Sequence, residues 1–181
     1  MIENKTINLA HLFDMQAVLD KEILRRRGIP ETTDLTDLKI DALDVEIAEL
    51  QNEVRYFKYW SQDQKPRMKA VRVPAMFEED REYYNPCLEE FVDGLHFFLS
   101  LGNDFDIPKD FQPIPFVSGD IRKQFKIIKR HIFVMEGPMH WYLAFNAYLG
   151  LAEMLGFSWD EVEAAYKEKH QINLKRQAEG Y

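Results

Sequence analysis

Two pairs of acidic residues, Glu46 with Glu49 and Glu90 with Asp93, have the types and spacing that indicate chemistry most directly. Each pair falls within an apolar helical pattern, and residues i and i+3 of an α-helix lie on one face. Four carboxylates packed together would repel one another and raise one another's pKa unless cations lay between them. Mg²⁺ is the natural candidate, because it binds a few carboxylates together with the phosphates of a substrate. The two pairs therefore predict a magnesium site that handles phosphate-ester or anhydride chemistry.

The alternative for either pair alone is a solvated helix edge, which is common by chance in a chain with 30% charged residues. Aromatic residues beside both pairs favour the metal site. On a helical projection Trp60 lies close in angle to Glu49. Phe97 lies beside Glu90 and Asp93, on the face opposite the apolar stripe. A helix that is apolar on both faces is usually interior to a bundle, and buried carboxylates need charge partners or metals.

Six segments carry the apolar spacing of helices, and strand alternation is almost absent. The expected helices cover about 8–27, 37–60, 88–101, 120–133, 140–155 and 158–177. Ser158 and Glu161 form a capping box, the clearest helix start in the chain. Residues 61–86, broken by prolines, are expected to form an irregular insertion with room for a short helix. We therefore predict an all-α fold, a bundle of about five to six main helices in one domain over residues 1–181.

Composition and charge narrow the classes of protein further. The net charge is −8 and no basic face is evident, which argues against a nucleic-acid polymer as partner. Cys87 is the single cysteine, so neither a disulfide framework nor a thiolate metal cluster is expected. The start of the chain, MIENKTINLA, lacks the layout of a signal peptide, and no apolar run approaches the ~20 residues that span a bilayer. We expect a cytoplasmic protein without membrane contact.

Segments from both ends and the middle of the chain resemble a known family. They are LFDMQAVLD (12–20), EIAELQNEVRYFKYW (46–60), LEEFVDGLHFFLSLG (88–102) and YKEKHQINLKRQAEGY (166–181). The family is that of the dimeric, all-α dUTPases, within the all-α NTP pyrophosphohydrolase superfamily. The acidic pairs define only the superfamily, whereas the C-terminal pattern, which ends in Gly180 and Tyr181, is more specific to this branch.

The resemblance implies that a homodimer cleaves dUTP to dUMP and pyrophosphate through a metal-activated water that attacks the β-phosphorus. It implies two or more Mg²⁺ ions, with Mn²⁺ as a substitute, held by Glu46, Glu49, Glu90 and Asp93. It also places Trp60 near the site. The sequence departs from the family in the long spacing between the two acidic pairs, which makes residues 61–86 an insertion. It departs again at residue 170, a histidine where the family often has asparagine.

The last expected helix carries polar residues suited to phosphate. Tyr166, Lys169, Asn173 and Arg176 step by 3, 4 and 3 and share one face. Lysine supplies a point charge and arginine a planar fork of donors, and both bind phosphate well. The alternative is that the basic residues only complement the C-terminus of the helix. The resemblance favours the phosphate site.

Gln16 places an amide within the apolar stripe of the first helix, and buried amides need partners. The resemblance implies that this amide pairs with the uracil edge; the alternative is an amide satisfied by a neighbouring helix. Glu49 or Glu46 would orient the attacking water or accept its proton, and we favour Glu49, although the sequence does not separate them. His96, His131 and His140 are interpreted as packing or surface residues.

The resulting prediction is a magnesium-dependent dUTP pyrophosphohydrolase. Two alternatives stay open at this point. One is an enzyme of the same fold that acts on another nucleotide, such as dCTP. The other is a non-catalytic helical module that binds partner proteins.

Overall fold

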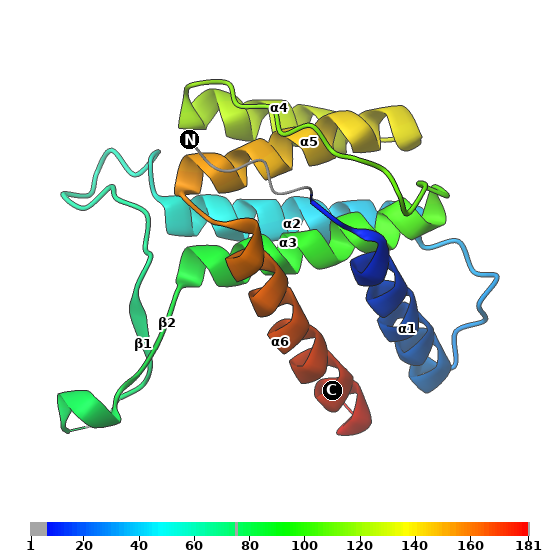
Figure 1. The fold of residues 1–181 in the computed structure, drawn as a ribbon, viewed down its shortest axis with the longest axis horizontal. Helices are drawn as coiled ribbons and strands as arrows, with labels where there is room; N and C mark the ends of the chain where they lie inside the picture. The colour runs from blue at the N-terminus through cyan, green and yellow to red at the C-terminus, as the bar shows by residue number, and fades with distance from the viewer. Residues whose placement is uncertain (1–6, 75, 181) are drawn as a thin grey trace.

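The computed structural model describes residues 7–74 and 76–180, so residues 1–6 and Tyr181, the end of the C-terminal pattern, lie outside the described part. In chain order the elements are α1 (Ala10–Arg27), α2 (Thr36–Val54), β1 (Ala70–Val73), the 3₁₀ helix η1 (Glu78–Asp80), β2 (Glu82–Tyr84), α3 (Pro86–Asp104), α4 (Ile121–Phe133), α5 (Pro138–Leu155) and α6 (Trp159–Ala178) (Figure 1). Six α-helices dominate these described residues, beside one two-stranded sheet, and the predicted all-α fold is confirmed. Over the same residues no helix is long and apolar enough to cross a membrane.

Helix α3 lies at the centre of the molecule and contacts α1, α2, α5 and α6. In the view of Figure 1, α4 and α5 pack together on one side of the α2–α3 pair, and α1 and α6 lie on the other. Phe91, Leu95 and Phe98 of α3 are fully buried. Tyr148 of α5 packs so closely that a Cβ on Gly94 would lie 2.5 Å from its hydroxyl oxygen. Because α3 is enclosed by four helices, the acidic residues that it carries are partly removed from water.

The end of α2 differs from the sequence prediction. The apolar spacing predicts a helix up to Trp60, which is wrong, because α2 ends at Val54. Arg55 takes the left-handed conformation, with φ of 65°, and its guanidinium donates to the Asp63 carbonyl and the Ser61 hydroxyl. These bonds close a turn that local apolar spacing does not report. The helical projection that set Trp60 beside the first acidic pair therefore does not apply. The capping box predicted at the start of α6 is present.

The insertion between α2 and α3 contains a β-hairpin that the sequence did not predict. Strands β1 and β2 pair antiparallel, with an irregular register between Val71 and Val73, and η1 between them is a short helix of the kind expected. Arg67 ties the base of the insertion to the helices. Its amide donates to the Glu53 carbonyl, its guanidinium pairs with the Glu53 carboxylate, and its carbonyl accepts from the Cys87 amide. Two short strands with exposed or half-buried side chains carry too little apolar alternation to be recognised locally.

Candidate active site

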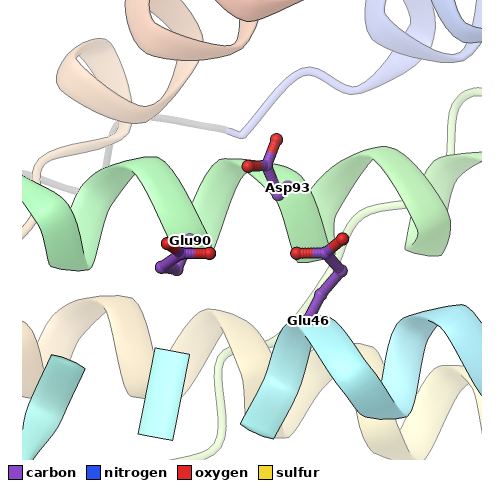
Figure 2. A group of neighbouring side chains, drawn as sticks. All are labelled: Glu46, Glu90 and Asp93. Carbon is purple, nitrogen blue, oxygen red and sulfur yellow. The ribbon is translucent and has the colours of Figure 1, made fainter. Parts of the chain in front are cut away.

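Glu46 of α2 and Glu90 and Asp93 of α3 converge where these two helices run side by side (Figure 2). Each offers one carboxylate oxygen, and the three oxygens lie within 4.8 Å of one another. We call these three residues the carboxylate cluster. Glu49, expected as a fourth ligand, is not among them, because its side chain is exposed about one turn further along α2. The structure therefore brings three of the four acids together and leaves the fourth at the rim.

Burial and mutual repulsion disfavour the ionised state of the cluster. Burial raises the pKa of Glu46 to about 7, and the charges of Asp93 and Glu49 add to this shift. Burial also raises the pKa of Glu90 to about 7, with further contributions from Asp93, Glu49 and Glu46. Such carboxylates are stabilised by positive charge placed among them. Three oxygen donors at this separation fit a hard divalent cation such as Mg²⁺.

Lys169 of α6 brings a positive charge to the cluster. Its Nζ lies 2.6 Å from Oδ2 of Asp93 and 3.4 Å from Oε1 of Glu89, and its side chain is 12% exposed. Burial lowers the pKa of Lys169, but the hydrogen bond and charge of Asp93 and the charge of Glu89 outweigh burial, so the net effect is a raised pKa. The ammonium therefore stays charged beside the acids.

A cavity of about 670 Å³ opens beside the cluster. Small-molecule sites commonly measure about 300–1,000 Å³, so this cavity can hold a nucleotide. Part of its wall carries Asp93 of the cluster and three α6 residues, Lys169, Asn173 and Arg176. Gln16 of α1 lies in another part of the wall. The cavity thus joins a strongly charged region to a buried region that offers hydrogen bonds.

The amide of Gln16 is held in one orientation by residues of three helices. Its Nε2 donates to Oδ1 of Asp20 at 2.7 Å. Its Oε1 accepts from Nδ1 of His96 at 2.7 Å and from the Tyr166 hydroxyl at 2.9 Å. Asp20 is held in turn by the Ser100 hydroxyl, which donates to Oδ2 at 2.7 Å. Since Nε2 makes one hydrogen bond within the described residues, its second N–H is available to a ligand.

His96, expected to be a packing or surface residue, lines the cavity and contacts Gln16. Its Nδ1 faces the Gln16 oxygen, which only accepts, so Nδ1 carries the proton and Nε2 is an acceptor. Among residues 7–74 and 76–180 this buried Nε2 finds no hydrogen-bond partner. Burial, with the charges of His170 and Lys169, lowers the pKa of His96 to about 3, so the ring is neutral. His96 lines the cavity one turn beyond Asp93, and this i+3 spacing is the sequence signal that could have found it.

A family model described as dUTPase matches residues 8–74 and 78–181, nearly the whole chain. The chain belongs to the dUTPase family. No curated protein matches it. The resemblance seen in the sequence is therefore confirmed, and the protein is an enzyme, a dUTP diphosphatase that depends on a metal and acts on a nucleotide. The alternative of a non-catalytic helical module is set aside.

The remaining predicted site residues differ in their burial and in their distance from the cavity. Trp60 is 66% exposed beyond the end of α2 and is not among the residues that line the cavity, so its contact with substrate stays a prediction. Tyr166 is buried and supports the Gln16 amide from behind. His170, at the position where the family often has asparagine, is also buried and bonds through Nε2 to the Met15 carbonyl at 2.9 Å.

Proposed function

We propose that the enzyme cleaves dUTP to dUMP and pyrophosphate by attack of a metal-activated water, with two or more Mg²⁺ ions held by Glu46, Glu90 and Asp93. Mn²⁺ is the expected substitute. The observation that carries the proposal is that Glu46 and Asp93 of the carboxylate cluster line the same cavity as the Gln16–His96 pair. When bound, Mg²⁺ would neutralise phosphate charge and lower the pKa of a water molecule.

Other side chains near the cluster take the remaining roles in this proposal. Glu49, which the resemblance implies as a fourth ligand, lies at the rim of the cluster, where it is suited to orient the water or accept its proton; Glu46 is the alternative. Lys169 offers a point charge to the phosphates, Arg176 a planar fork of donors, and Asn173 an amide. All three residues of α6 line the same cavity, which supports a triphosphate site along this helix.

The Gln16–His96 pair supports uracil as the base. One N–H of Gln16 can donate to a uracil carbonyl, and Nε2 of His96, which is covered in this structure, would accept from the neighbouring N3–H once the base uncovers it. Cytosine carries no hydrogen at N3, so its lone pair would face the Nε2 lone pair and leave a buried acceptor unpaired. The site is therefore complementary to dUTP and mismatched to dCTP, the second candidate substrate.

Pyrophosphate release from dUTP, dCTP, dTTP and UTP, each with Mg²⁺ and with a chelator, tests the proposal. We expect dUTP to be cleaved fastest and the chelator to abolish the reaction. Glu46→Gln and Asp93→Asn should lower kcat by orders of magnitude, whereas Glu153→Gln, on the exposed face of α5, should not. Equal cleavage of dTTP and dUTP would overturn the claim of dUTP specificity, and preference for dCTP would favour the second candidate.

The proposal also includes the single domain, the homodimer and the cytoplasmic location expected from the sequence. Light scattering coupled to size-exclusion chromatography measures the mass of the enzyme in solution. We expect twice the chain mass of 21.5 kDa. A mass of one chain would contradict the homodimer without bearing on the chemistry of the site.

A further inference from the structure

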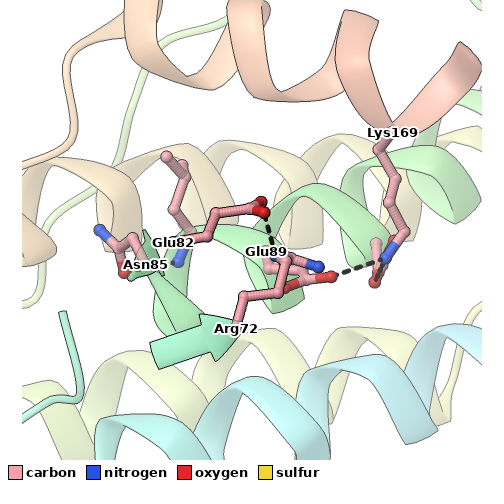
Figure 3. Close-up of polar contacts among 7 residues, drawn as sticks. Arg72, Glu82, Asn85, Glu89 and Lys169 are labelled. Carbon is pink, nitrogen blue, oxygen red and sulfur yellow. Dashed lines mark hydrogen bonds and ion pairs between the residues drawn. The ribbon is translucent and has the colours of Figure 1, made fainter. Parts of the chain in front are cut away.

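The β-hairpin of the insertion reaches the candidate active site through one arginine. Arg72, on β1, donates from Nη2 to Oε2 of Glu89 at 2.8 Å (Figure 3). Its guanidinium also lies over the Tyr84 ring, 4.3 Å from the ring centre, and its Nε is 3.8 Å from Oε1 of Glu82. Contacts on several sides therefore hold the guanidinium in one place.

Glu89 also contacts a residue of α6. While Arg72 binds one of its oxygens, the other oxygen, Oε1, lies 3.4 Å from Nζ of Lys169 (Figure 3). Lys169 lies 2.6 Å from Oδ2 of Asp93, a member of the carboxylate cluster. Charges of alternating sign thus connect the hairpin to the candidate metal site through Arg72, Glu89, Lys169 and Asp93.

We propose that Arg72 is a positioning residue for Lys169. By holding Glu89, it keeps a second anionic partner beside the lysine, so that the ammonium stays at the phosphate region of the cavity when a cation takes Asp93. The proposal rests on the proposed function, and it gives a role to the insertion that separates the two acidic pairs.

The distances of the two contacts of Lys169 support a role for Glu89 as its second partner. The short contact joins the lysine to Asp93, and the longer one joins it to Glu89. A cation bound at the cluster competes for the Asp93 carboxylate, so the lysine then depends on Glu89. If Arg72 were absent, Glu89 would keep only the 3.4 Å contact with Lys169 and would be drawn more strongly toward the cation itself. Arg72 therefore favours the arrangement in which Glu89 binds lysine and leaves the metal to the cluster.

The simpler explanation of the contact between Arg72 and Glu89 is a solvated surface ion pair that contributes little. The burial of Glu89 and Lys169 argues against that explanation. The Arg72 side chain is 43% exposed, Glu89 is 26% exposed and Lys169 is 12% exposed. Screening by water therefore weakens from the hairpin inward. Because the outer pair is partly exposed, we expect an effect of about fivefold rather than a complete loss.

Steady-state kinetics of Arg72→Ala at saturating Mg²⁺ test the proposal. The KM for dUTP and the inhibition constant of pyrophosphate should each rise about fivefold, while inhibition by deoxyuridine, which lacks phosphate, stays unchanged. Arg72→Gln, which keeps a hydrogen-bond donor without the charge, should fall between wild type and Arg72→Ala. Lys69→Ala is the matched control, since Lys69 lies in the same insertion over the Tyr83 ring, 3.8 Å from its centre. It should leave all three constants unchanged, and equal effects of the two alanine variants would overturn the proposal.

A double-mutant cycle separates positioning from a general effect of the hairpin. In a Lys169→Ala background, Arg72→Ala should raise KM no further, because the residue through which it acts is gone. Additive effects would overturn the proposal. The same cycle can be measured as free energies of unfolding of the metal-free protein, which requires no substrate. These free energies should also show coupling between Arg72 and Lys169. Coupling in a protein that fails to cleave dUTP would overturn the proposed function alone, whereas cleavage without coupling would overturn only the role of Arg72.

Discussion

The ammonium of Lys169 and the carboxylate of Asp93 lie 2.6 Å apart, so a residue of the last helix places its positive charge against a member of the carboxylate cluster. A divalent cation bound at the cluster would need the same carboxylate. Lysine and metal ion therefore compete for Asp93, and each should weaken the binding of the other.

Replacing Lys169 with methionine tests this competition. In the metal-free enzyme the change should lower the free energy of unfolding by about 1–3 kcal/mol, because Asp93 loses a charged hydrogen bond. Added Mg²⁺ should then raise the melting temperature by more in the variant than in wild type. Lys167→Met, which removes an exposed pair with Glu163 on the same helix, should cost less than about 0.5 kcal/mol. An equal metal-induced rise in Lys169→Met and wild type would show that no competition exists.

The stability of the metal-free enzyme should depend on pH through the cluster. The pKa values of Glu46 and Glu90 rise from 4.5 to about 7 in the folded state, so the folded protein holds more protons than the unfolded chain between these values. The contribution of these residues to stability therefore falls as the pH increases from about 4.5 through 7. Urea unfolding in chelator should show Glu46→Gln gaining stability relative to wild type across this window.

His96 contributes to the pH dependence of stability with the opposite sign to Glu46 and Glu90. Comparing wild type with Glu46→Gln cancels that contribution, because both proteins contain His96. Because the pKa of His96 is lowered from 6.5 to about 3, its contribution to stability is lost as the pH falls through this range. A difference between wild type and Glu46→Gln that is constant from pH 5 to 8 would show that Glu46 is not protonated in the folded state near neutral pH.

Base selection should depend on Asp20, although we assign it no contact with the substrate. Its two oxygens accept from Gln16 Nε2 and from the Ser100 hydroxyl, so Asp20→Ala removes the acceptor that orients the Gln16 amide. Asp20→Ala should therefore release the Gln16 amide and reduce the ratio of kcat/KM for dUTP over dCTP roughly tenfold. Asp104→Ala is the control, because Asp104 pairs with Lys39 and is no partner of Gln16. An unchanged ratio in Asp20→Ala would show that the orientation of Gln16 does not decide base recognition.

The packing of α5 against the segment before α4 should not tolerate an added methyl group. A Cβ on Gly150 would lie 1.8 Å from the backbone carbonyl oxygen of Phe116, which cannot move away as a side chain would. Gly150→Ala should lower the free energy of unfolding by about 2 kcal/mol or more. Gly137→Ala, at a site where the Cβ meets nothing within 4 Å, should cost less than about 1 kcal/mol. Similar unfolding midpoints for the two variants would contradict the close contact.

Local periodicity determined much of this protein. The apolar spacing marks each of the six helices, and the capping box marks the start of α6, because both signals depend only on residues a few positions apart. The spacing of Glu90 and Asp93 likewise places both on one side of α3 before any packing is known. The resemblance of segments from both ends and the middle of the chain identified the family, and the family model confirms it.

Tertiary structure alone decided which residues meet. The rotation of α2 against α3 brings Glu46 to Glu90 and Asp93 and leaves Glu49 at the rim, because the total packing of both helices sets that rotation. Trp60 leaves the helix because Arg55 takes the left-handed conformation and binds the turn that follows, through the Asp63 carbonyl. The contact of His96 with Gln16 joins α3 to α1, and the hairpin arginine reaches α6 through Glu89. Such contacts depend on the packing of the whole chain, so no local pattern of residues encodes them.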